Sequence, residues 1–162
     1  MKHIGQIINA MIAYYAGDVR RINHFLKVYG FAKAIGEMEG LDESTQEIIE
    51  IAALTHDIGI KNSEKKYNSS AGNYQQIEGP PEAKKLLAEL GIESGVIDRV
   101  CWLIAHHHTY TDIQGIDYQI LVEADFLVNF YEDDMSIDSV HSAGGKMFKT
   151  LSGKAILNAI YS

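Results

Sequence analysis

The sequence contains only two prolines, Pro80 and Pro81, and they are adjacent. Because proline is the residue that most strongly interrupts a helix interior, nearly all of the chain is free to be helical. No stretch alternates apolar and polar residues over more than a few positions, as a half-buried strand would. The 162-residue length suits one domain. We therefore expect residues 1–162 to form a single compact all-α domain of about six to eight helices.

Apolar residues at helical spacing predict where the helices lie. The expected helices span approximately residues 4–16, 18–39, 44–59, 80–91, 94–107, 117–132 and 152–161. Asp18 is the expected cap of the second helix, Ser44 and Glu47 form a capping box for the third, and Pro80 and Pro81 open the fourth. Residues 60–79 are polar and rich in Asn, Ser and Gly, so we expect a long loop, a feature that is often functional.

The charge balance narrows the class of partner. Twenty-two acidic and 14 basic side chains give a formal net charge of −8, which disfavours nucleic-acid and anionic-membrane binding but is compatible with a small phosphorylated ligand. No apolar run approaches the ~18 residues of a spanning helix. The N-terminal segment lacks the pattern of a signal peptide, and the single Cys101 cannot form an intrachain disulfide. The expected location is the cytoplasm.

Polar side chains interrupt the apolar faces of two predicted helices. His24 shares a helix face with Val28 and Ile35, so it needs a polar partner in the interior. His56 and Asp57 follow the most apolar helix, IIEIAALT, where an unpaired aspartate would cost several kcal/mol. Hydrogen bonds inside the core, from His24 to a carbonyl and between His56 and Asp57, are the alternative to ligand binding.

Asp125 interrupts the apolar stripe of a third helix, between Leu121 and Val128. The faces that carry His24, the His56–Asp57 pair and Asp125 are expected to meet in one core. Two imidazoles and two carboxylates suit Fe, Mn, Ni or Zn better than Ca, and a set without cysteine does not resemble a structural zinc site.

Three consecutive histidines, His106, His107 and His108, end the fifth predicted helix. Successive helical residues point about 100° apart, so at most two of them can face one ion. A solvated, exposed triplet is the alternative. His3 and His141 lack a comparable setting, and we expect both at the surface.

The order His24, His56–Asp57, Asp125, with the text AALTHDIG, resembles the HD superfamily of metal-dependent phosphohydrolases. The resemblance runs from His24 to Asp125. It implies an HD-type helical domain in which His24, His56, Asp57 and Asp125 hold a divalent ion. One or two ions are implied, drawn from Fe, Mn, Ni, Zn and Mg.

The resemblance also implies ligands for a second ion. Some members have a histidine at the position that Glu78 occupies here, in the text EGPPEA. They have a further histidine in an I-x-x-H pattern, which corresponds to His107. His108, beside it, is a candidate for substrate contact. Many members have lysine directly after the glycine of the motif. Here Ile60 follows Gly59, and Lys61 is the candidate for contact with a substrate phosphate, with a solvated lysine as the alternative.

The function that the resemblance implies is hydrolysis of a phosphoester or phosphoanhydride of a small molecule, for example a nucleotide. Metal-activated water would be the nucleophile, with Asp57 and His56 at the catalytic centre. Two alternatives remain: another kind of enzyme, a di-iron oxygenase, and a different class of protein, a metal-binding regulatory or ligand-binding domain without turnover.

Overall fold

Nine α-helices and no strand make up residues 3–162, the part of the chain that this computed structural model describes. The helices are α1 (Ile4–Tyr14), α2 (Val19–Met38), α3 (Glu43–Thr55), α4 (Ile60–Tyr67), α5 (Gly72–Glu89), α6 (Ser94–His106), α7 (Ile116–Glu132), α8 (Ile137–Met147) and α9 (Leu151–Ile160). The all-α prediction is confirmed. The helix count exceeds the expected six to eight because two segments without clear apolar periodicity are also helical.

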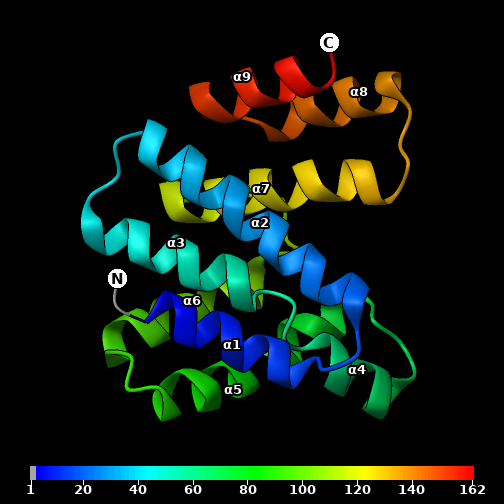
Figure 1. Cartoon of the computed structure of the whole chain (residues 1–162). Coiled ribbons are helices and arrows are strands. Elements are labelled where there is room, and N and C mark those ends of the chain that lie inside the picture. The colour runs from blue at the N-terminus through cyan, green and yellow to red at the C-terminus, as the bar shows by residue number, and fades with distance from the viewer. Residues whose placement is uncertain (1–2) are drawn as a thin grey trace.

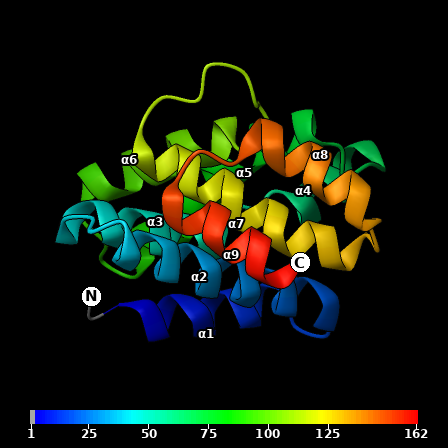
Figure 2. The same cartoon turned by 90° about the horizontal axis from the view of Figure 1, so that it is seen from above.

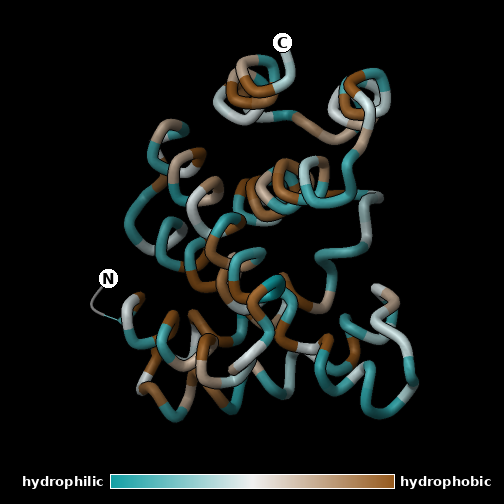
Figure 3. The backbone as a smooth tube through the Cα atoms, turned by 45° about the vertical axis from the view of Figure 1, so that its right-hand side comes forward, coloured by the Kyte–Doolittle hydropathy of each residue, from teal (hydrophilic) through white to brown (hydrophobic). Residues whose placement is uncertain are grey.

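The packing is centred on α2, α3 and α7. Helix α2 packs against α3 and α7, α3 also contacts α6 and α7, and α5 lies along α6 (Figure 1). Helices α8 and α9 cover one end of the bundle, and the connection between α6 and α7 arcs outward from it (Figure 2). Hydrophobic positions gather on the helix sides that face other helices (Figure 3). No helix within residues 3–162 is both long enough and apolar enough to cross a membrane.

The ends of α2 follow the sequence prediction. Asp18 is the N-cap, and its Oδ1 accepts a hydrogen bond from the Arg21 backbone N–H. At the other end Gly40 has φ +71°, and the N–H of Leu41 donates back to the Gly36 carbonyl at 3.1 Å. Glycine adopts this left-handed conformation without steric penalty, so it ends the helix here.

The start of α3 differs from the prediction. Its N-cap is Asp42, whose Oδ1 accepts from the Thr45 backbone N–H at 2.9 Å, and Ser44 lies inside the first turn. The capping box of Ser44 and Glu47 was therefore wrong by two positions. Aspartate and serine are about equally good caps, so composition alone did not separate the two positions.

The predicted loop at residues 60–79 is wrong. These residues form α4 and the first turns of α5, separated by a short turn in which Asn68 has φ +52°. Pro80 and Pro81 consequently lie inside α5 rather than at its start. The two missing N–H groups remove helical bonds to the carbonyls one turn earlier, but the helix continues through them.

Polar and small residues on the inner face of α4 and α5 explain the error. Ser63, Gln75, Glu78 and Gly79 are buried there. A Cβ on Gly59 would lie 2.6 Å from the Gly79 backbone nitrogen. The backbone of the turn that follows α3 is therefore in direct contact with the backbone of α5. A face of this kind has no apolar periodicity, although it is as buried as a hydrophobic one.

Helix α8 was also not predicted, because its sequence is rich in serine and glycine. Gly144 allows α8 to pack on Leu157 of α9, since a Cβ there would lie 2.4 Å from the leucine side chain. The fully buried carboxylate of Glu123, on α7, accepts hydrogen bonds from the backbone N–H groups of Lys149 and Thr150 and from the Thr150 hydroxyl. This carboxylate ties the start of α9 to α7.

Candidate metal centre

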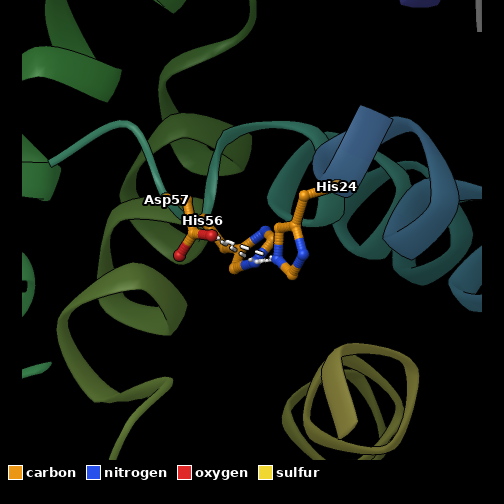
Figure 4. Close-up of side chains that lie close together, drawn as sticks. All are labelled: His24, His56 and Asp57. Atoms are coloured by element: carbon orange, nitrogen blue, oxygen red, sulfur yellow. Dashed lines mark hydrogen bonds and ion pairs between the residues drawn. The ribbon is translucent and has the colours of Figure 1, made fainter. Parts of the chain in front are cut away.

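The side chains of His24, His56, Asp57 and Asp125 converge from three helices. His24 lies on α2, His56 and Asp57 follow the last residue of α3, and Asp125 lies on α7. The Nε2 atom of His24 is 3.3 Å from His56 Nε2, 3.1 Å from Asp57 Oδ2 and 3.2 Å from Asp125 Oδ1. His56 Nε2 lies 3.4 Å from the same two carboxylate oxygens. Figure 4 shows His24 and the His56–Asp57 pair pointing toward one another. The structure thus brings together the four residues that the sequence grouped.

A second group shares the Asp57 carboxylate. Its other oxygen, Oδ1, lies 3.5 Å from His107 Nε2. Asp57, His107 and His108 each offer a ligand atom, and these atoms lie within 4.8 Å of one another. Asp57 therefore stands between two groups of potential ligands, one on each of its oxygens.

Three imidazoles of the centre are held through the same ring nitrogen. Nδ1 of His24 lies 3.1 Å from Glu132 Oε1, Nδ1 of His56 lies 2.8 Å from the Ala53 carbonyl, and Nδ1 of His107 lies 2.7 Å from the Ile104 carbonyl. Carbonyl and carboxylate oxygens only accept, so Nδ1 carries the proton in each ring. When these rings are neutral, each Nε2 presents a lone pair to the centre.

This arrangement fits a bound cation. Without a cation, the Nε2 lone pairs of the neutral rings would face carboxylate oxygens at contact distance, and these groups repel one another. His107 Nε2 and Asp125 Oδ1 are buried and have no hydrogen-bond partner within residues 3–162. Leaving such a buried group unsatisfied costs about 1–3 kcal/mol, and more for a charged one. Nitrogen and oxygen donors directed at one point suit a divalent transition metal.

The electrostatics of the four residues also require positive charge. Burial lowers the pKa of His24, but the adjacent carboxylates of Asp125 and Asp57 outweigh it and raise that pKa to about 10. Burial also lowers the pKa of His56, but the carboxylates of Asp57 and Asp125 outweigh burial and raise that pKa well above its usual value. The imidazoles in turn hold the pKa values of Asp57 and Asp125 below their usual range, against the effect of burial. Protons on the rings balance the carboxylates, and a bound metal ion would take their place, so metal affinity should rise with pH.

The three consecutive histidines face different directions. His106 Nδ1 donates to the Trp102 carbonyl, and its ring stacks on Trp102 with centroids 4.0 Å apart. His107 is buried in the centre, and His108 lines the adjoining cleft. Burial and the neighbouring His107 lower the pKa of His108 to about 4, so its ring is neutral near pH 7. Two of the three thus face the centre, and both follow the last residue of α6.

The centre opens into a polar cleft of about 530 Å³. Its walls come from α2, the start of α4, α5, α7 and the turns beside them. The lining residues are Asp18, Arg20, Arg21, His24, Asp57, Ile60, Ser70, Gln75, His108, Asp125, Asn129, Glu132 and Asp133. The guanidinium groups of Arg20 and Arg21 bring positive charge to a wall that is otherwise acidic.

Comparison with known proteins identifies the family. The sequence profile described as HD domain matches residues 21–140, which include both groups of potential ligands. The chain belongs to the HD domain family. Its fold is similar to the crystal structure of a predicted HD superfamily hydrolase from an uncultured Thermotogales bacterium, with 21% identity and a TM-score of 0.70. That match covers 98% of this chain and 85% of the other. No curated protein matches the sequence.

Within residues 3–162, Glu78 and Lys61 are neither among the grouped potential ligands of this HD domain nor among the residues that line the cleft. The Glu78 carboxylate forms an ion pair with Lys66 at 2.8 Å and accepts from the Tyr67 hydroxyl at 3.3 Å, and it belongs to neither group of potential ligands found within residues 3–162. The Lys61 ammonium donates to the Tyr14 carbonyl at 3.1 Å and lies over the Tyr14 ring, away from the cleft. Both residues lie in the segment 60–79 for which the sequence predicts a loop, so the directions of their side chains could not be inferred.

Several residues around the HD centre were missed in the sequence. Asn129 and Glu132 lie four and seven residues after Asp125, on the same face of α7, and Arg20 and Arg21 lie one turn before His24 on α2. Helical spacing from the recognised ligands would have indicated these four. Gln75 had no such signal, because its segment was expected to be a loop.

Proposed function

We propose that this HD domain is a metal-dependent phosphohydrolase that cleaves a phosphoester or phosphoanhydride of a small molecule, for example a nucleotide. The observation that supports this proposal best is the shared carboxylate of Asp57, which contacts His24 and His56 through one oxygen and His107 through the other. A carboxylate between two sets of nitrogen ligands is suited to one ion or to a pair of ions.

The residues divide into two sets. His24, His56, Asp57 and Asp125 would hold one divalent ion, and Asp57, His107 and His108 would hold a second. A bound ion lowers the pKa of its water toward ~7 and offsets the charge of phosphate oxygens. The protein holds the ligand nitrogens in the required tautomer through Glu132 and two backbone carbonyls, so little reorganisation is needed on binding.

The cleft supplies the groups that would bind and orient the substrate. Arg20 and Arg21 offer donors for phosphate oxygens, and Arg21 is fixed by contacts to Asp18 and Glu64. Ser70 and Asn129 offer neutral polar groups for hydroxyls of the remainder of the molecule. Arginine on the wall would bring an anionic substrate to an otherwise acidic protein.

The test combines elemental analysis of the purified protein with phosphate release from a panel of nucleotides and phosphomonoesters, with and without a chelator. Asp57→Ala should lose both metal and hydrolysis, because one side chain serves both halves of the centre. His141→Ala is the control, since that ring donates to the Tyr161 carbonyl far from the cleft. Full metal content and turnover in the Asp57 variant would overturn the proposal.

Ligand binding without turnover is a second candidate, and the Lys66–Glu78 ion pair favours it. Lys66 engages the Glu78 carboxylate, which would replace a family histidine as a ligand. In this case nucleotides would raise the melting temperature of the metal-loaded protein without releasing phosphate. Iron in the preparation together with oxygen consumption would instead support the di-iron oxygenase alternative.

A further inference from the structure

Helix α5 reaches the centre through Gln75, a residue that the proposed function does not otherwise use. The side chain is buried, with 6% of its surface exposed. Its Nε2 donates to the Ser70 carbonyl at 2.6 Å, so its Oε1 is directed at His108, where it lies 2.9 Å from Nε2. The Ser70 carbonyl can only accept, and this fixes which end of the amide faces the histidine.

The contact with Gln75 determines the tautomer of His108. An amide oxygen only accepts, so His108 Nε2 must carry the proton and Nδ1 the lone pair. The contact of Nδ1 agrees with this, because the Tyr110 hydroxyl, 3.4 Å away, can donate to it. His108 is therefore held in the opposite sense to His24, His56 and His107, whose protons are on Nδ1.

The first turns of α5 also fix the position of the His108 ring and backbone. Gln76 Oε1 accepts from the His108 backbone N–H and from the Thr109 hydroxyl, each at 3.1 Å. Gly72 lies against the ring, and a Cβ there would approach ring atoms to 2.8–3.0 Å. Gly72, Gln75 and Gln76 of one helix thus hold the ring and the backbone of His108 in place.

We propose that Gln75 is a positioning residue that fixes His108 as the Nε2–H tautomer and so presents Nδ1 as its ligand atom for a second metal ion. Helix α5 then contributes to this half of the centre through Gln75 rather than through Glu78. The inference rests on the metal centre of the proposed function, but it concerns a ring tautomer that exists before any metal or substrate binds.

Long-range ¹H–¹⁵N NMR of the histidine rings tests the tautomer in metal-free protein at pH 8. Wild-type His108 should carry its proton on Nε2. Gln75→Leu removes the acceptor and should populate the Nδ1–H form, whereas Gln75→Glu keeps an acceptor and should restore the wild-type pattern. Gln46→Leu, at an equally buried glutamine on α3, is the control and should leave His108 unchanged. A wild-type His108 with its proton on Nδ1 would overturn the proposal without any variant.

Titration with Zn²⁺, which is diamagnetic, tests the consequence for metal binding. The second equivalent should move the His108 Nδ1 resonance and leave the Nε2 proton in place. Loss of such an outer partner typically weakens metal binding about 10–100-fold, so Gln75→Leu should weaken the second ion by that factor and spare the first. Unchanged second-ion affinity in Gln75→Leu would refute the role of Gln75. A protein that binds both ions as expected but releases no phosphate would refute the phosphohydrolase and leave this inference standing.

Discussion

Glu132 illustrates how single residues around the centre prepare it for a metal. Its carboxylate accepts from His24 Nδ1 at 3.1 Å and also pairs with Lys27 at 3.2 Å near the surface. The first contact fixes the orientation of a candidate ligand, and the second holds the carboxylate that makes it. Carboxylate partners of this kind also increase the basicity of the ligand nitrogen.

Glu132→Gln should therefore weaken metal binding, by about 10–100-fold, while the fold is retained. Competition with a chromophoric chelator measures the affinity. Lys27→Met is the matched control, because it removes the exposed partner of the same carboxylate but leaves the contact with His24. Equal metal affinity in Glu132→Gln and wild type would show that the Glu132 contact does not contribute to metal binding by His24.

The pKa of His24 predicts how the stability of the metal-free protein depends on pH. The pKa is raised from 6.5 to about 10, so the folded state binds more protons than the unfolded state between these values. The stabilisation is complete below pH 6.5 and is lost as the pH rises toward 10. The melting temperature in excess chelator should therefore fall over this range. With Mn²⁺ present the fall should be smaller or reversed, because the metal replaces the protons. Parallel thermal melts with chelator and with Mn²⁺ check both statements.

At the scale of elements, the sequence predicted the helices whose buried faces are apolar stripes and missed those whose buried faces contain mainly polar residues or glycine. His24 and Asp125 interrupt the apolar stripes of α2 and α7, and His56–Asp57 directly follows the apolar α3, so these polar interruptions were the signal. The first turns of α5 bury Gln75 and Glu78, and that surface has no period to detect. The four grouped ligand residues could therefore be predicted. Gln75 could not, because its position depends on a helical turn that the sequence did not predict.

The contact between α5 and the turn that joins α3 to α4 can be tested at Gly59. A Cβ there would lie 2.6–2.7 Å from the backbone of Gly79 and Gln75, so Gly59→Ala must push α5 away. Overpacking typically costs about 1–3 kcal/mol. Gly30→Ala is the control: it is an exposed α2 position with nothing within 4 Å of the new Cβ, and it should gain about 0.5–1 kcal/mol. Urea unfolding measures both, and a neutral Gly59→Ala would mean that α5 is not tightly docked.

At the scale of the whole molecule, α7 connects the metal centre to the C-terminal helices. Asp125 faces the centre, and Glu123, two residues earlier, holds the start of α9 through Lys149 and Thr150. Helices α8 and α9 supply none of the residues that line the cleft. Their contribution is therefore to cover α7 and keep it in place.

Replacing Glu123 should separate stability from metal binding. Glu123→Gln places an amide group where two backbone N–H donors, the Thr150 hydroxyl and the Gln119 side-chain amide converge. An unsatisfied buried group costs about 1–3 kcal/mol. We expect a loss of that size in the free energy of unfolding, with metal content unchanged. Chemical denaturation and elemental analysis of the same preparation measure the two quantities. A loss of metal in this variant would show that α9 controls the position of Asp125.

The candidate ligands come from distant points along the chain, at residues 24, 56, 57 and 125. A bound ion would consequently act as a reversible crosslink that closes two long loops of backbone. Closing long loops restricts the unfolded chain, although the gain grows only slowly with loop length. Unfolding would then have to release the ion or carry it along with a constrained chain. The lifetime of the folded protein, and its resistance to proteases, would in that case follow the metal supply of its surroundings.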